Sequence, residues 1–346
     1  MRGRDENLRG FAPVYHPAGF DTELRQALED LQAGRWWATR DLLARTGGDW
    51  ALRTSRTQVL ATAAARSDVV QAWLVEEPRN PDALVMGARV LVERALQAHR
   101  GGHPRERALS DEAYHACRLA SETAPEDPVP WVCLLALAQL DVRLGYAEHW
   151  RAAWEPMLPA GPWRLLYRVR ERDWGNREAY HRMLAFYYAC AATSPADALV
   201  FAQWVASWAP EGSPLRILPL YVRMEIYRRR REAGPADPLL RTQWAQEPVI
   251  WEVHRAFQGW TEDTAGSLGD LNYLAHGLWA AHQYDGAAQV FRALGDYATR
   301  LPWLYVSDDP RVAELGVREF VRARSECLSP ARSRTVPRAT PRPRLV

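Results

Sequence analysis

Five residue pairs in this sequence place a helix-capping side chain directly before a proline. They are Asn80-Pro81, Asp127-Pro128, Ser194-Pro195, Ser213-Pro214 and Asp309-Pro310. A capping side chain accepts the free backbone N–H groups at a helix start, and proline fits the first turn because its missing N–H has no partner there. Apolar residues recur at spacings of three and four between these starts, whereas period-two alternation is nearly absent. We therefore predict an all-α fold.

The predicted helices fill most of the chain. A helical hairpin is expected from Asp21, a predicted N-cap, with an interruption at Gly34 and an end at Gly47. Further helices are expected near 50–64, 67–77, 81–98, 107–123, 128–144, 147–155, 177–193, 195–208, 214–230, 238–259, 270–282, 285–297 and 310–325. We predict an irregular leader at 1–20, one helical domain at 21–328 with an alternative sub-boundary near 145–175, and a disordered Arg/Pro-rich tail at 329–346.

One pattern of spacings occurs twice in the predicted helices. Its first copy is Val70, Trp73, Pro78, Leu84, Gly87 and Leu91, and its second is Cys117, Ala120, Pro125, Trp131, Leu134 and Ala138. The successive gaps in both copies are 3, 5, 6, 3 and 4, and the copies lie 47 residues apart. If an insert of about 13 residues near 99–110 is set aside, the remaining period is 34, the length of a helix-turn-helix repeat.

These residues resemble the tetratricopeptide repeat family. Trp131 with Leu134-Leu135 matches the first helix of such a repeat, and Ala113, Cys117, Ala120 and Pro125 match the second helix of the preceding one. A later copy runs from Leu271, Leu274-Ala275 and Leu278 to Ala287, Phe291 and Leu294. The resemblance implies a TPR-like α-solenoid of stacked antiparallel helical hairpins. The Leu-Gly pair of the family is intact nowhere, and 145–175 and 231–268 do not fit, so an irregular helical bundle is the alternative.

The resemblance also implies a function. Members of the family hold partners on the inner face of their hairpins, which here would expose Arg89, Asn272, His276 and Trp279, although Trp279 also suits a core position. Arginine grips carboxylates and an aromatic side chain supplies a hot spot. We expect a non-enzymatic protein- or peptide-binding scaffold, with neither cofactor nor metal and with an undefined oligomeric state.

Composition narrows the chemistry. All 44 cationic side chains are arginine, so no lysine is available for a Schiff base, a pyridoxal cofactor or a Gly-Lys-Ser/Thr phosphate loop. The 4 cysteines show no metal-ligand spacing, which suits a reduced bacterial cytoplasmic protein. No stretch approaches 18 apolar residues, so no membrane span is expected. The 16 tryptophans must find a core or a partner surface, because each ring buries about 150–250 Å².

Two alternatives stay open at this point. Arg228, Arg229, Arg230 and Arg231 could contact an anion, and together with the arginine tail they define an alternative nucleic-acid-associated regulator. A helical enzyme of secondary metabolism with a tryptophan-lined pocket is the third hypothesis. No catalytic constellation supports it: the run Ala265–Gly269 lacks the strand of a nucleophile elbow, and His99, His103, His115 and Cys117 match no common zinc spacing.

Overall fold

The computed structural model describes residues 11–234, 238–258, 260 and 267–329. Over these residues every named element is helical, and extended pairing is limited to two isolated bridges, Val14 with Tyr297 and Arg151 with Gly161. The predicted all-α fold is therefore confirmed. The chain divides into a larger unit, residues 16–226, and a smaller unit that combines residues 1–15 with 227–346. The 145–175 segment lies inside the larger unit.

The larger unit contains ten α-helices, two 3-10 turns and the start of an eleventh helix over its described residues. They are α1 (Thr22–Gln32), α2 (Trp37–Thr46), α3 (Trp50–Ala64), α4 (Val69–Glu76), α5 (Pro81–Arg100), α6 (Glu106–Thr123), α7 (Val129–Leu137), η1 (Ala138–Leu140), α8 (Trp163–Arg170), α9 (Arg177–Ala189), α10 (Pro195–Trp208), η2 (Pro214–Ile217) and α11 (Leu218–Ala233).

Capping side chains begin these helices largely where the sequence predicted them. Asp21 accepts the N–H of Leu24, Asn80 accepts those of Asp82 and Ala83, and Ser194 forms a reciprocal capping box with Asp197. Ser213 accepts the N–H of Leu215 at the start of η2. Asp127 and Asp309 also accept nearby backbone N–H groups, but the helices after them begin one and four residues beyond the prolines expected to open them, at Val129 and Ala313.

The region from 141 to 170 departs most from prediction. The helix expected at 128–144 ends in η1, and the one expected at 147–155 is wrong, because that segment is irregular. The Asp141 carboxylate accepts the backbone N–H groups of Gly145 and Tyr146 and lies 2.9 Å from His149 Nδ1, which fixes a turn in place of a helix. Helix α8 follows at 163–170, where none was predicted.

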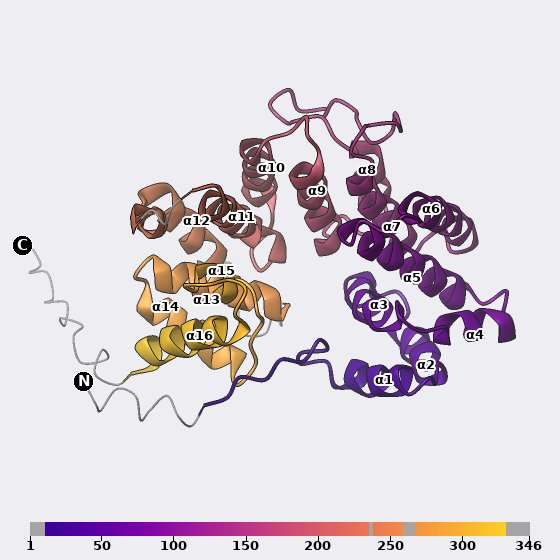
Figure 1. Cartoon of the computed structure of the whole chain (residues 1–346), viewed down its shortest axis with the longest axis horizontal. Helices are drawn as coiled ribbons and strands as arrows, with labels where there is room; N and C mark the ends of the chain where they lie inside the picture. Colours follow the sequence, from indigo (N-terminus) through magenta and orange to yellow (C-terminus); the bar gives the residue numbers. More distant parts are fainter. Residues whose placement is uncertain (1–10, 235–237, 259, 261–266, 330–346) are drawn as a thin grey trace, which may run out of the picture. The chain divides into compact units, whose positions relative to one another are not determined.

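Helix α7 lies at the centre of the larger unit. It packs against α5, α6, α8 and α9, several of which lie beside it in Figure 1. Its sequence, VPWVCLLAL, is apolar all round, as expected for a helix with neighbours on every side. Trp131 is the one residue of α7 that is only half-buried. The interior helix therefore reaches the surface through a tryptophan.

Small residues let neighbouring helices approach closely, as the repeat pattern implied. A methyl group at Gly87 of α5 would come within 2.7 Å of the Leu74 side chain of α4. Ala113, Cys117 and Ala120 line the buried side of α6, which packs against α5 and α7. These contacts establish closely packed helices that are neighbours in sequence.

The smaller unit is also helical over its described residues. Its elements are the end of α11, η3 (Pro238–Ala245), α12 (Glu247–Gln258), α13 (Leu268–Ala280), α14 (Tyr284–Leu294), α15 (Trp303–Val306) and α16 (Ala313–Leu328). Trp303, Phe291 and Phe320 form its aromatic centre, with ring centroids 5.3–6.0 Å apart. Val14 exchanges backbone hydrogen bonds with Asp296 and Ala298, which ties the N-terminal segment to this unit.

Candidate functional site

A pocket opens where Trp131 reaches the surface of the larger unit. Its lining is aromatic and cationic, with one carboxylate, and comes from α6, α7, the loop before α8, and α8. The residues are Tyr114, Arg118, Trp131, Glu148, Arg164 and Arg168, with Leu165 as an apolar wall. The pocket encloses about 480 Å³, which lies within the ~300–1,000 Å³ range of small-molecule sites. We call it the Trp131 pocket.

Arginines surround the indole ring of this pocket. The Cζ atoms of Arg118, Arg168 and Arg172 lie 5.8, 5.6 and 5.2 Å from the Trp131 ring centroid. Arg172 is anchored, because it donates to the carbonyl oxygens of Pro125 and Arg168. Arg118 and Arg168 are half-exposed, so their guanidinium groups can reorient toward a ligand.

Two donors of the Trp131 pocket have no acceptor among the residues that the structure describes. The Nε1 atom of Trp131 is buried without a hydrogen-bond partner. Arg164 is exposed and forms neither a hydrogen bond nor an ion pair within the described part of the chain. The one carboxylate in the lining, Glu148, accepts the Tyr114 hydroxyl at 3.2 Å, and burial together with this carboxylate raises the pKa of Tyr114.

A second surface lies on the same helix. The Arg170 guanidinium is 5.5 Å from the Trp154 ring centroid and 5.4 Å from that of Trp208. Trp204 contacts both rings, and Trp174 contacts Trp208. We call Trp154, Arg170, Trp174, Trp204 and Trp208 the Arg170 surface. Trp154 and Trp174 are 50% and 51% exposed, which is unusual for the largest apolar side chains.

The Arg170 surface also holds donors without acceptors. Within the described residues Arg170 has no carboxylate partner, and the buried Nε1 atom of Trp208 has no hydrogen-bond partner. The ring contacts continue inward through Trp163 and Phe201. The exposed tryptophans are thus held by a packed aromatic cluster, and the surface can offer cationic and indole donors without rearrangement.

The periodicity of α8 explains how one short helix serves both places. Arg164 and Arg168 are four residues apart and lie on the face that lines the Trp131 pocket. Leu166 and Val169 are fully buried on the core face. Trp163 and Arg170 lie seven residues apart, two turns along one side, and both contact Trp154.

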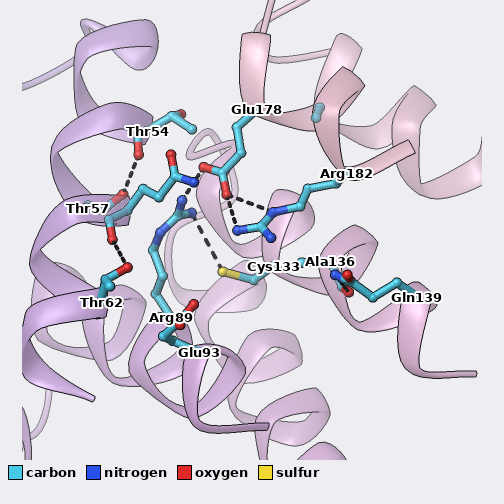
Figure 2. A network of polar contacts seen from close by, with 12 residues as sticks. Thr54, Thr57, Thr62, Arg89, Glu93, Cys133, Ala136, Gln139, Glu178 and Arg182 are labelled. Carbon is cyan, nitrogen blue, oxygen red and sulfur yellow. Dashed lines mark hydrogen bonds and ion pairs between the residues drawn. The ribbon is translucent and has the colours of Figure 1, made fainter. Parts of the chain in front are cut away.

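Arg89, expected on an exposed inner face, is in the interior instead. Only 4% of it is exposed. It donates to the Glu178 carboxylate and approaches the Cys133 Sγ atom at 3.8 Å, while Arg182 donates to Glu178 at 2.7 Å (Figure 2). Burial opposes ionisation of Glu178, but the charges of Arg89 and Arg182 outweigh it and lower the pKa of this carboxyl. The prediction failed because α5 is covered by α3, α4, α6 and α7, which leave it no open face.

The predicted residues of the later copy are also packed inside, in the smaller unit. Asn272 and His276 are 0% and 2% exposed, because α13 is covered by α12, α14, η3 and α16. Asn272 accepts the indole N–H of Trp303 at 2.8 Å, and burial lowers the pKa of His276 to about 3. Trp279 is half-buried and donates to Glu326 at 2.9 Å. The structure brings these three together in a core and separates them from Arg89, which belongs to the other unit.

The arginine cluster at the end of α11 is partly used within the smaller unit. Arg231 donates to the backbone carbonyls of Tyr305, Ser307 and Asp308 at 2.6–3.0 Å. Arg228 pairs with Glu232 four residues on, whereas Arg230 is exposed. At least two of the four cations therefore have structural partners. The arginine tail at 330–346 lies outside the described residues.

The remaining candidate residues form no shared centre. His99 Nδ1 lies 2.7 Å from Glu106, and within the described ranges no three His, Cys, Asp or Glu side chains could hold a metal ion together. The Ala265–Gly269 run falls largely outside the described residues, and Ser267 caps α13. The sequence analysis missed Trp131 as a pocket residue, together with Arg164, Arg168 and Arg170. The spacing of the arginines on 163–170 was the available signal.

Within the described part of the chain, no helix is both long enough and apolar enough to cross a membrane. No family model, curated protein or solved structure matches this chain.

Proposed function

We propose that this chain is a non-enzymatic binding protein that holds a protein partner on the Arg170 surface. One observation carries the proposal: Arg170 lies between two tryptophan rings without a carboxylate partner in the described chain, beside tryptophans that are half-exposed. Tryptophan and arginine dominate the energetic centres of protein interfaces. The predicted partner presents a carboxylate beside apolar side chains, which would satisfy both Arg170 and the Trp208 Nε1 atom.

This proposal moves the expected binding site. The residues expected on a concave face, Arg89, Asn272 and His276, are buried and already have partners or core neighbours. The Arg170 surface keeps the chemistry expected there, an arginine for a carboxylate and aromatic rings for apolar contacts. It differs in coming from the loop before α8, from α8, from the turn after α8 and from α10.

Affinity capture from the native host tests the proposal. Full-length wild type is compared with the double variant Trp154→Ala/Arg170→Ala and with Trp37→Ala, a matched control because Trp37 is also 50% exposed in the same unit. A protein recovered with wild type and Trp37→Ala, but lost from the double variant, is the expected result. Titration of that purified partner should show an affinity loss of about 30-fold or more, as at a hot spot.

The opposite outcome is equally clear. A partner that the double variant retains at wild-type affinity would contradict the proposed site, provided that circular dichroism shows unchanged helicity. A chain lacking residues 329–346 should also retain the partner. Loss of binding only in this shortened chain would move recognition to the tail and would favour the nucleic-acid-associated alternative, whose affinity must fall steeply with salt.

We also propose that the larger unit is a degenerate TPR-like α-solenoid. Close contact of Gly87 with Leu74 and burial of Ala113, Cys117 and Ala120 support it, because these are the positions at which the repeat pattern places small residues. An experimental structure provides the test. The rotation and translation that relate the α4–α5 pair to the α6–α7 pair should also relate α6–α7 to the next hairpin; unrelated transformations would indicate an irregular bundle.

A further inference from the structure

We propose that the Trp131 pocket binds a phosphate monoester whose organic group is aromatic or apolar. This site is separate from the Arg170 surface and does not depend on the protein partner proposed above. Three features carry the inference: the charge of the lining, its donors without acceptors, and the mixed character of its walls.

The charge of the lining favours an anion with more than one negative charge. Arg118, Arg164 and Arg168 face a single carboxylate, Glu148, so the lining sums to two positive charges. Around it, Arg172 adds one cation and Glu122 and Glu171 add two carboxylates, which leaves a net positive charge. Guanidinium groups bind phosphate oxygens through paired N–H donors, and more than one can serve the same phosphate.

The existing ion pairs in the pocket are weak competitors. Arg118 lies 4.0 Å from Glu122 and Arg168 lies 3.2 Å from Glu171, and all four side chains are at least 38% exposed. Exposed pairs of this kind contribute little to stability. Arg164 has no partner in the described residues that a ligand would need to displace.

The pocket also lacks an acceptor that it could use. The buried Trp131 Nε1 atom can only donate, and it has no partner in the described structure. A buried donor in this state is costly unless an acceptor arrives. A phosphate offers several acceptor oxygens at once, which would satisfy this N–H group as well as the arginines.

The walls indicate what carries the phosphate. Tyr114, Trp131 and Leu165 give aromatic and apolar surface, and a volume of about 480 Å³ exceeds what a bare inorganic ion fills. Glu148 is held by the Tyr114 hydroxyl and lies in the lining as a single repulsive charge. The site therefore suits an anion at one end and a ring or apolar group at the other.

Isothermal titration calorimetry of the full-length protein tests this with three probes. Phenyl phosphate has a dianionic group and a ring, inorganic phosphate has only the charge, and benzoate has a ring with one negative charge. We expect phenyl phosphate to bind most tightly and inorganic phosphate to bind more weakly, with benzoate weakest. No heat from phenyl phosphate at millimolar concentration, or equal affinity for benzoate, would overturn the proposal.

Substitutions then locate the binding. Arg164→Gln and Arg168→Gln should each weaken phenyl phosphate binding by about tenfold, whereas Arg66→Gln, on an exposed site outside the pocket, should leave it unchanged. Glu148→Gln keeps an acceptor for Tyr114 but removes the repulsive charge, so it should tighten binding by roughly threefold or more. Misfolding cannot produce that gain. Unchanged affinity in all three pocket variants would refute the site.

Discussion

Arginines in the interior of the larger unit differ from those on its tryptophan rings in the partners they have. Arg53 is 5% exposed and contacts the carboxylates of Asp82 and Asp127, each at 2.6 Å. Arg89 is likewise buried against Glu178. Arg164 and Arg170, by contrast, have no carboxylate partner among the described residues. The same side chain therefore serves two purposes, and carboxylate pairing distinguishes them.

The buried pairs join helices that are distant in sequence. Arg53 of α3 reaches the residues that open α5 and α7, and Arg89 of α5 reaches Glu178 in the first turn of α9. Asn176, the N-cap of α9, donates to Thr54 of α3 at 3.0 Å. These polar contacts fix which helix ends meet inside the unit. The ring-stacked arginines join nothing of this kind and are free to meet a ligand.

The largest effect is expected from breaking a buried pair. Glu178→Ala leaves Arg89 and Arg182 without their carboxylate, and removal of one partner of a buried pair typically costs ~3–5 kcal/mol. Urea denaturation followed by circular dichroism should show this loss in the larger unit. The double variant Arg89→Met/Glu178→Leu should recover much of it, because no buried charge is then unpaired at this contact. A loss below about 1 kcal/mol for Glu178→Ala would break the comparison.

Acid should weaken the same pair. The pKa of Glu178 is lowered from its ordinary value of 4.5, so its stabilising charge is fully present above pH 4.5 and is lost as pH falls through the folded-state pKa. Glu178→Gln cannot titrate at this position. The difference in unfolding free energy between wild type and Glu178→Gln should therefore shrink below pH 4.5. A difference that stays constant down to acid unfolding would show that the pair carries no such charge.

A smaller loss is expected at the Arg170 surface. Arg170→Gln removes contacts with the Trp154 and Trp208 rings, which are worth about 0.5–2 kcal/mol at partly exposed sites. Thermal unfolding of the variant should show a modest decrease in stability, well below that of Glu178→Ala. A loss as large as that of Glu178→Ala would mean that Arg170 is a structural cation like Arg89.

The smallest effect is expected at Arg164. This exposed arginine has no partner in the described chain, so Arg164→Gln should change the unfolding free energy by no more than about 0.5 kcal/mol. The same urea experiment measures it beside Glu178→Ala. Substantial destabilisation would place Arg164 among the structural arginines and would remove it from the Trp131 pocket.

Local sequence signals predicted much of the fold. Capping residues such as Asn80 and Ser194 begin helices through contacts with residues two or three positions away, so their effect is visible in the sequence itself. The helix expected at 147–155 failed because Asp141 organises that segment through side-chain contacts that compete with helix formation. Helix α8 was missed because it has only 8 residues and follows this irregular loop.

The sites were harder to predict than the helices. Tyr114, Trp131 and Arg164 meet only after three helices have packed, and the sequence spacing between those helices says nothing about this meeting. Arg89 was assigned to a surface because charged residues are usually exposed. Glu178, 89 residues away, makes its burial possible, and no local pattern connects the two.

Arginine modification by phenylglyoxal, mapped by mass spectrometry with and without phenyl phosphate, tests the distinction between the two kinds of arginine most directly. We predict that Arg164 and Arg168 react readily in the native protein and are protected by phenyl phosphate, whereas Arg53 and Arg89 stay unmodified in both conditions. If Arg89 reacted as fast as Arg164, or if phenyl phosphate protected neither Arg164 nor Arg168, the account would be contradicted.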